Sequence, residues 1–304
     1  MTTPSPIPQS PNSGRISSRA MLAALSIKTW SPRKLDKQVT REVAQSKGVT
    51  GDPGQAGRYT KNLIPYSDTL EAVQTIVSQA RQEFYALTLP WAQDGSRILS
   101  ADAYLDLQAR LAKLETDFKH AVRKFILAYP NLQTRAQTEL TQLYDPADYP
   151  DVTALEHKFA WKFNVLPMPD AEDFRVDLGD DLTAQMRTEI ETSITSSVSE
   201  AMQNAWARLA ERVGYVVERL SDPEAVFRDS LLGGLRDLTA TMRKLNLTND
   251  VDLERTIQDL ENRVLTHEPG DLRKNASTRQ SVAADAQAIH NRMAGFFGKP
   301  GDAQ

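Results

Sequence analysis

The sequence contains no cysteine. This absence excludes disulfides, thiol nucleophiles, iron–sulfur clusters and zinc sites with thiolate ligands, and it fits a reducing compartment. Long apolar runs are also missing, because no stretch approaches the roughly 18 residues that a membrane span needs. The N-terminus lacks the charged start and apolar core of a signal peptide. We therefore expect a cytoplasmic protein that makes no contact with a membrane.

An excess of one charge sign is missing as well. The 304 residues carry a formal net charge of -4, with a pI of about 5.7. Such a chain has no global positive field that would hold nucleic acid or an anionic membrane. Hydrophobic residues make up 40% of the sequence, which is enough for the core of one large or two medium domains.

Known catalytic motifs are absent too. The sequence has no HExxH zinc motif and no Gly-x-Ser-x-Gly nucleophile elbow. Its four histidines fall in separate predicted elements, without partners at metal-ligand spacing: His120, His157, His267 and His290. We therefore predict that the protein is not an enzyme and that it requires no metal and no cofactor.

One acidic stretch offers a choice between a metal site and helix capping. It contains Asp170, Glu172, Asp173, Asp177, Asp180 and Asp181. Clustered carboxylates suit a hard cation such as magnesium, whereas acidic residues at a helix start complement the helix dipole. Because Asp180 and Asp181 directly precede a long helical pattern, we favour capping. A metal-dependent hydrolase would require that Asp173→Ala abolish its activity.

A second acidic fragment resembles the acid, acid and lysine set of metal-dependent nucleases. Asp151 precedes Glu156 and Lys158. In those enzymes the two parts lie on neighbouring strands, and here too few residues separate them to reverse a strand. We therefore give this fragment little weight.

The longest helical pattern runs from Leu182 to Leu245. Apolar residues recur there at spacings of three and four, which is typical of one face of an amphipathic helix. A turn at residues 221–223 divides the pattern, and Pro223 is expected to open the second helix. The stretch predicts a helical hairpin. Its apolar stripes require further helices, from this chain or from another copy.

Other segments predict shorter helices and a few strands. Strict alternation from Phe159 to Val165 indicates a half-buried strand, with residues 26–30 or 173–178 as its partner. The predicted helices are 33–46, 68–87, one from 101 that breaks at Tyr129-Pro130, 132–143, one from 250 that ends at Pro269-Gly270, and one from about 272. We predict a mainly α (α+β) fold with long antiparallel helices, a helical hairpin and one small antiparallel sheet.

Composition suggests four successive parts. Residues 1–20 are rich in proline and serine and predict a disordered tail. Residues 21–178 predict a mixed helical domain with the small sheet, and residues 179–294 predict the hairpin with two C-terminal helices. Residues 295–304 predict a flexible tail.

The N-terminal third is the clearly cationic region. Its basic residues include Lys28, Arg33, Lys34, Lys37, Arg41, Lys47, Arg58 and Lys61. Four glycines between 48 and 57 form a loop that could cradle phosphate, but no Walker motif follows, so a flexible connection is the simpler interpretation. Nucleic-acid binding through Lys34, Lys37, Arg41, Lys47, Arg58 and Lys61 is the alternative that this region keeps open.

Six segments together resemble an uncharacterised family of phage and bacterial proteins, a domain of unknown function. They are KTWSPRKLDKQVTREVAQSKG, RYTKNLI, TLPWAQDGSRIL, DYPDVTALEHKF, PMPDAEDFRVDL and FRDSLLGGLRDL. Genes of that family often lie beside a MoxR-type AAA ATPase and a von Willebrand A protein, so the resemblance implies a partner in an ATPase-driven assembly. No catalytic residue comes with it.

Within those segments, Trp91, Arg97, Phe174 and Arg175 are the places where an interaction surface is expected, although a tryptophan in a turn more often anchors the core. The leading hypothesis is a non-enzymatic phage-type accessory protein, a self-associating helical scaffold or an adaptor for a MoxR-type AAA ATPase, in the host cytoplasm if phage-encoded. The alternative is a nucleic-acid-binding protein that acts in phage replication or recombination.

Overall fold

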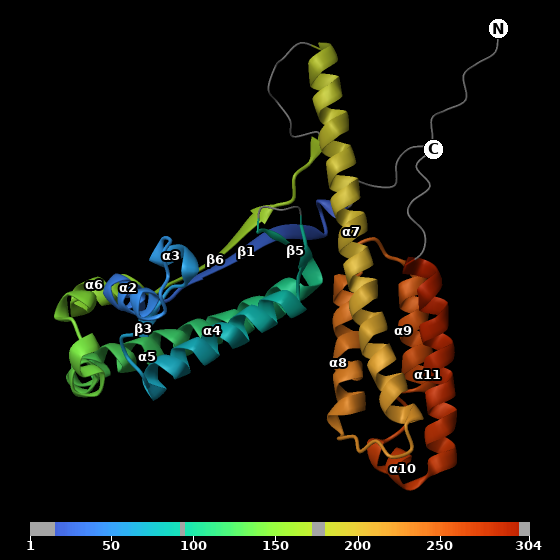
Figure 1. Ribbon diagram of the computed structural model, residues 1–304. Helices are drawn as coiled ribbons and strands as arrows, with labels where there is room; N and C mark the ends of the chain where they lie inside the picture. Colours follow the sequence, from blue (N-terminus) through green and yellow to red (C-terminus); the bar gives the residue numbers. More distant parts are fainter. Residues whose placement is uncertain (1–15, 92–94, 172–179, 298–304) are drawn as a thin grey trace. The chain divides into compact units, whose positions relative to one another are not determined.

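The computed structural model describes residues 16–91, 95–171 and 180–297 (Figure 1). The chain forms two compact units, and the boundary passes through several elements. The first, here called the bundle unit, comprises Met1–Ala24, Phe84–Gln108 and Asn164–Gln304. The second, the inserted unit, comprises Leu25–Glu83 and Ala109–Phe163. Among the described residues, no helix is long and apolar enough to cross a membrane.

The inserted unit is built on most of two antiparallel helices, α4 (Asp68–Ala86) and α5 (Ala101–Leu140). Its smaller elements are β2 (Arg33–Leu35), α2 (Lys37–Ser46), α3 (Pro53–Ala56), β3 (Thr60–Asn62), η1 (Thr141–Leu143), η2 (Pro146–Asp148) and α6 (Val152–Glu156). Aromatic side chains fill its core, where the Trp30 ring meets Phe125 and Tyr129 at centroid distances of 6.0 and 5.7 Å.

The helix predicted from residue 33 begins later than expected. Asp36 caps α2, because its Oδ1 accepts the backbone N–H groups of Gln38 and Val39. A side chain that accepts from the first turn marks the start of a helix, so the preceding residues are free to form β2. They pair in antiparallel fashion with β3.

The predicted helix break at Tyr129-Pro130 is wrong, because α5 continues through Pro130 to Leu140. Proline removes one backbone donor and usually kinks or ends a helix. Here the residues on both sides are fixed by packing: Tyr129 and Ala136 are fully buried. The Tyr129 hydroxyl also donates to the Pro150 carbonyl oxygen over 3.0 Å. Tertiary contacts therefore outweigh the missing backbone hydrogen bond.

A small four-stranded sheet has the order β4-β5-β1-β6. Its strands are β1 (Ala20–Lys28), β4 (Leu89–Pro90), β5 (Arg97–Ser100) and β6 (Ala160–Pro167). The strand predicted from alternation is confirmed as β6, and its neighbour β1 starts six residues before the predicted Ser26. The other proposed partner, 173–178, lies outside the described residues.

The bundle unit contains the predicted helical hairpin, α7 (Asp180–Ser221) and α8 (Ser230–Leu245). Helices α9 (Val251–Arg263), α10 (Pro269–Lys274) and α11 (Ala276–Phe297) complete it. Their buried apolar residues form one continuous core, with Leu209, Leu235, Ile257 and Ile289 fully enclosed. The prediction of a mainly α protein with long helices and one small sheet is confirmed.

The second helix of the hairpin starts at Ser230 and not at Pro223 as predicted. Two arginines from distant segments hold the intervening residues. Arg279 Nε donates to the Leu220 carbonyl oxygen over 3.0 Å, at the end of α7, and Arg273 Nη1 donates to the Phe227 carbonyl oxygen over 3.1 Å. These long-range contacts stabilise a loop that a local pattern cannot reveal.

The start of α10 and the end of α11 differ from the prediction. Pro269 begins α10, where the fixed φ of proline suits the first helical turn, and it does not end the preceding helix. Helix α11 continues to Phe297, so residues 295–297, which were predicted to belong to a flexible tail, are helical.

The predicted boundary near residue 179 differs from the division found. Residues 164–171 belong to the same unit as α7, and residues 84–108 join that unit too. The inserted unit is therefore discontinuous in sequence. Strand pairing brings distant segments together: Met21 of β1 pairs with Leu99 of β5.

Candidate interaction surfaces

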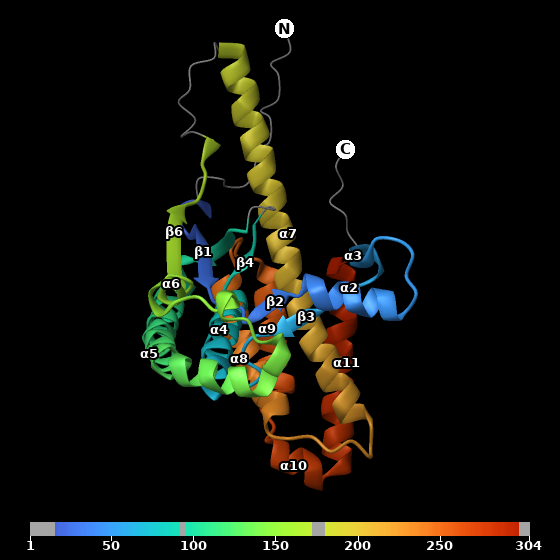
Figure 2. The same cartoon turned by 60° about the vertical axis from the view of Figure 1, so that its left-hand side comes forward.

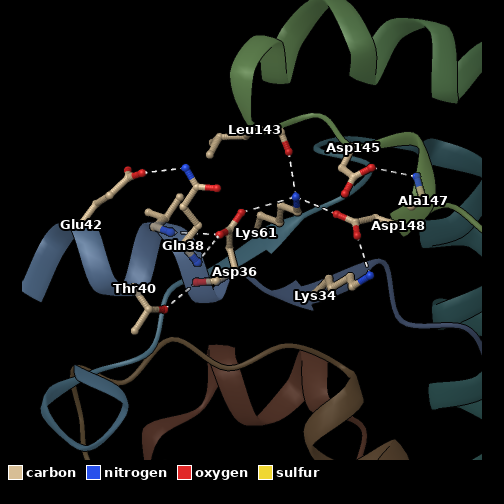
Figure 3. A network of polar contacts seen from close by, with 11 residues as sticks. Lys34, Asp36, Gln38, Thr40, Glu42, Lys61, Leu143, Asp145, Ala147 and Asp148 are labelled. Carbon is tan, nitrogen blue, oxygen red and sulfur yellow. Dashed lines mark hydrogen bonds and ion pairs between the residues drawn. The ribbon is translucent and has the colours of Figure 1, made fainter. Parts of the chain in front are cut away.

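A buried network of charges fixes the antiparallel pair of strands β2 and β3 in the inserted unit (Figure 3). The Lys61 ammonium lies 2.6 Å from Asp148 Oδ2, 2.8 Å from the Leu143 carbonyl oxygen and 3.4 Å from Asp36 Oδ2. The Lys61 side chain is only 7% exposed and Asp148 only 6%. Lys34 completes the network at 2.5 Å from Asp148 Oδ1. The buried charges of Lys61 and Asp148 therefore each lie beside an opposite charge, as buried charges require.

The network changes the acidity of its members. Burial by itself would lower the pKa of Lys61, but Asp148 and Asp36 outweigh it and raise that pKa above 10.5. Burial would raise the pKa of Asp148, yet hydrogen bonds and charges from Lys34 and Lys61 lower it below 3.8. The pKa of Asp36 is also lowered, first by the backbone N–H of Val39. All of these groups are therefore charged near neutral pH.

The six cations predicted to contact nucleic acid divide into two groups. Lys34 and Lys61 belong to the buried network, so Lys61 is not available to a ligand. The other four are exposed on or beside α2 and α3: Lys37, Arg41, Lys47 and Arg58. The structure thus brings four of the six to one surface. Asp148, which binds the other two, was missed because its sequence context predicts only a turn.

The α2 surface is hollowed on both sides of Arg58. One hollow of about 310 Å³ has Val43, Ala44, Lys47 and Tyr59 in its lining, and the other, of about 520 Å³, has Lys37 and Arg41. Thr40, Pro53 and Arg58 line both. The two hollows are therefore adjacent, and we call them together the α2 groove. Two glycines of the glycine-rich stretch line it, Gly57 in the smaller hollow and Gly54 in the larger.

Two of the predicted interaction residues have structural contacts in the bundle unit. Trp91 is buried in the core, as the anchoring interpretation predicted. Arg97 is half-buried: its Nε donates to Thr88 Oγ1 over 2.7 Å, and its guanidinium lies 4.7 Å from the centre of the Tyr85 ring. Neither offers a large free surface. Phe174 and Arg175 lie outside the described residues.

A second arginine meets the same turn. Arg208 Nη1 donates to the Tyr85 carbonyl oxygen over 3.0 Å and Nη2 to that of Thr88 over 3.1 Å. The Tyr85 carbonyl belongs to the last turn of α4, where carbonyl groups have no partner within the helix, and Thr88 lies just beyond the helix end. Burial, together with the charge of Arg208, lowers the pKa of Arg97 to about 10. The pair stabilises the α4–β4 turn and stays charged at neutral pH.

The first turns of α7 form a different kind of surface. Helix α7 continues past the ends of α8, α9 and α11 in both views (Figure 1 and Figure 2). No residue from 181 to 193 is buried, whereas Ile194 is 4% exposed. Leu182, Met186 and Ile190 continue the apolar stripe of the bundle at a spacing of four. Ile190 is half-buried and packs against the bundle core, Met186 is half-buried, and Leu182 is 56% exposed. We call these three residues the α7 stripe.

The remaining acidic candidates take structural roles where they are described. Asp151 caps α6, because its Oδ1 accepts the Ala154 N–H over 2.8 Å, and this capping accounts for the nuclease-like fragment. Asp170 accepts from the Ser17 hydroxyl over 3.1 Å. Residues 172–179 lie outside the described part. Within it, no group of three or more acidic or histidine side chains could hold a metal ion.

Comparison with models of known families, with curated proteins and with solved structures gives no match. The two surfaces above therefore rest on the geometry of this chain alone. They are the α7 stripe of the bundle unit and the α2 groove of the inserted unit.

Proposed function

We propose that this is a non-enzymatic accessory protein that associates with itself through the first turns of α7. The α7 stripe carries the proposal. Its apolar face continues the face that packs in the bundle, so the same side of the helix is apolar where bundle helices cover it and where they do not. The exposed part of an amphipathic helix face is stabilised when a partner helix covers it, and a second copy of this chain would bury the α7 stripe in that way.

The second part of the proposal is a role as an adaptor in a MoxR-type AAA ATPase system that also includes a von Willebrand A protein. Its support is the resemblance of the six sequence segments, and the exposed first turns of α7 are a suitable element for partner binding. The phage origin and the cytoplasmic location belong to this same proposal.

Light scattering coupled to size exclusion tests self-association directly. The single chain has a mass of 33.9 kDa, so we expect a particle of twice that mass or more that dissociates on dilution. A monomer at every concentration that also fails to retain a purified MoxR-type ATPase on an affinity resin would contradict the proposal.

Nucleic-acid binding, with a role in phage replication or recombination, is the second candidate. The exposed cluster of Lys37, Arg41, Lys47 and Arg58 favours it, because neutralised phosphates release counterions and so drive binding. A titration of labelled DNA at several salt concentrations tests it: the affinity must fall steeply as salt rises.

A further inference from the structure

The α2 groove carries positive charge that the protein does not use. Lys37, Lys47 and Arg58 have no carboxylate partner among the described residues, and Arg41 makes one contact, from its Nε to the Lys37 carbonyl oxygen. The acidic residue that lines the groove, Asp52, already accepts the Gly54 N–H over 2.9 Å to start α3. The groove therefore offers four cations to an anionic ligand.

The local charge balance differs from that of the whole chain. Residues 26–62 contain eight Lys or Arg and three Asp or Glu, which gives a net charge of +5, although the chain as a whole carries -4. Lys34 and Lys61 are neutralised by Asp36 and Asp148. The excess is thus concentrated on the α2 groove.

The lining of the groove between the cations is apolar. Val43, Ala44, Val49, Pro53 and Ala56 line the smaller hollow together with Tyr59, whose side chain is 39% exposed. An apolar lining with a partly exposed aromatic ring suits a flat, weakly polar group such as a nucleobase. A phosphate group alone would not need this apolar lining.

The backbone of the ligand-facing loop is fixed in place. The Tyr59 N–H donates to Thr40 Oγ1 over 3.0 Å, and the Tyr59 carbonyl oxygen accepts the Asp36 N–H over 2.9 Å. Two residues later, Lys61 is held by Asp148. The backbone of Tyr59 is therefore held by Thr40 and Asp36, close to the buried network of Lys61 and Asp148 that Figure 3 shows, and this reduces the conformational entropy lost when a ligand binds.

We propose that the α2 groove binds single-stranded nucleic acid, with phosphates on Lys37, Arg41, Arg58 and Lys47 and a base against Tyr59. This inference rests on the second candidate function and specifies its site and ligand. The guanidinium groups of Arg41 and Arg58 match phosphate in a bidentate manner. A duplex keeps its bases stacked inside, so it can use the cations but not the apolar lining.

Fluorescence anisotropy with a labelled oligothymidylate of about 12 nucleotides tests the site, next to a duplex of the same length. The full-length protein is titrated at several salt concentrations. With about four phosphate contacts, the logarithm of the association constant should fall with a slope of about -3 against the logarithm of salt. The single strand should bind at least tenfold more tightly than the duplex.

Two variants and their matched controls locate the site. Arg41→Gln/Arg58→Gln should reduce the affinity at least tenfold and roughly halve the salt slope, because two phosphate contacts are lost. Lys113→Gln/Arg123→Gln removes the same charge from exposed positions on α5 and should change neither. Tyr59→Leu should weaken binding at least fivefold, whereas Tyr59→Phe, which keeps the ring, should not.

The possible outcomes distinguish the assignment of the α2 groove from the more general proposal that the protein binds nucleic acid. Equal binding of strand and duplex, or equal losses in the α2 and α5 variants, would overturn the groove assignment and leave nucleic-acid binding in place. No binding of either nucleic acid would overturn both. Displacement of the labelled strand by poly-glutamate at an equal charge concentration would identify an acidic polypeptide as the ligand and would also overturn the inference.

Discussion

Lys34 and Lys61 lie directly opposite each other in the antiparallel pair of strands β2 and β3, and Asp148 forms ion pairs with both. Like charges in opposite positions of an antiparallel pair repel. Asp148 offsets this repulsion, because each of its two oxygens forms an ion pair with one ammonium group, at 2.5 and 2.6 Å. The pairing of these strands therefore depends on a carboxylate that comes more than eighty residues after Lys61 in the sequence.

Removing that carboxylate should destabilise the inserted unit. Asp148→Asn leaves the buried Lys61 with the Leu143 carbonyl oxygen and with Asp36, the more distant carboxylate. Loss of one partner of a buried pair costs about 3 kcal/mol or more. Urea unfolding at pH 7, followed by tryptophan fluorescence, measures the change in free energy of unfolding. Asp145→Asn is the control: Asp145 is exposed and caps only η2, so we expect less than about 1 kcal/mol. Equal losses in the two variants would refute a special role for Asp148.

The same network predicts a loss of stability in acid. The pKa values of Asp36 and Asp148 are lowered on folding, so the unfolded chain binds protons more readily. Their contribution is fully present above the ordinary value of 3.8 and is lost as the pH falls through the lower folded values. Urea unfolding from pH 6 to pH 3 should show a steeper decline in the wild type than in Asp36→Asn/Asp148→Asn. Parallel curves for the two proteins would contradict this.

Two adjacent glycines in α8 should respond in opposite ways to alanine. A methyl group at Gly233 meets no atom within 4 Å, so Gly233→Ala should stabilise the bundle unit by about 0.5–1 kcal/mol through helix propensity. At Gly234 it would collide with the guanidinium of Arg212, which donates to the carbonyl oxygens of Ser230 and Leu231. Gly234→Ala should therefore destabilise the unit, since those hydrogen bonds must break. Thermal unfolding compares the pair, and a gain in both variants would show that Arg212 can move away freely.

Arg208 should matter for stability because it binds the Tyr85 carbonyl in the last turn of α4 and the Thr88 carbonyl just beyond it. Hydrogen bonds from a charged group contribute about 1.5–3 kcal/mol, so Arg208→Gln should lower the free energy of unfolding by about that amount. Arg255→Gln is the control, since the Arg255 side chain is 65% exposed and pairs only with Asp252 on its own helix, which is worth less than about 0.5 kcal/mol. Denaturation in urea measures both. Equal, small effects would mean that the α4 carbonyls are satisfied without Arg208.

Features set by local pattern were predictable from the sequence. Strict alternation predicted β6, and Ser100 and Asp250 each accept a backbone N–H at the start of a helix where the sequence predicted one. The turn predicted at residues 221–223 agrees with the end of α7 at Ser221. These patterns depend on residues that are close in sequence, so they can be recognised without knowledge of the tertiary contacts.

Features set by distant contacts were not predictable. Continuation of α5 through Pro130 depends on the packing of Tyr129 against Trp30, and the late start of α8 depends on Arg273 and Arg279. The candidate surfaces show the same limit. The sequence indicated the cationic region, but only the fold separates the buried Lys61 from the exposed Arg58.

Sedimentation velocity of two matched α7 variants tests the central claim of self-association through the α7 stripe most directly. Leu182→Glu/Met186→Glu places two charges on the stripe, and Ala184→Glu/Thr188→Glu places two charges at the same spacing on the opposite face of the same turns. We predict that the first variant sediments as a 33.9 kDa monomer while the second and the wild type remain associated. Wild-type behaviour in the stripe variant, or dissociation in both variants, would contradict the account.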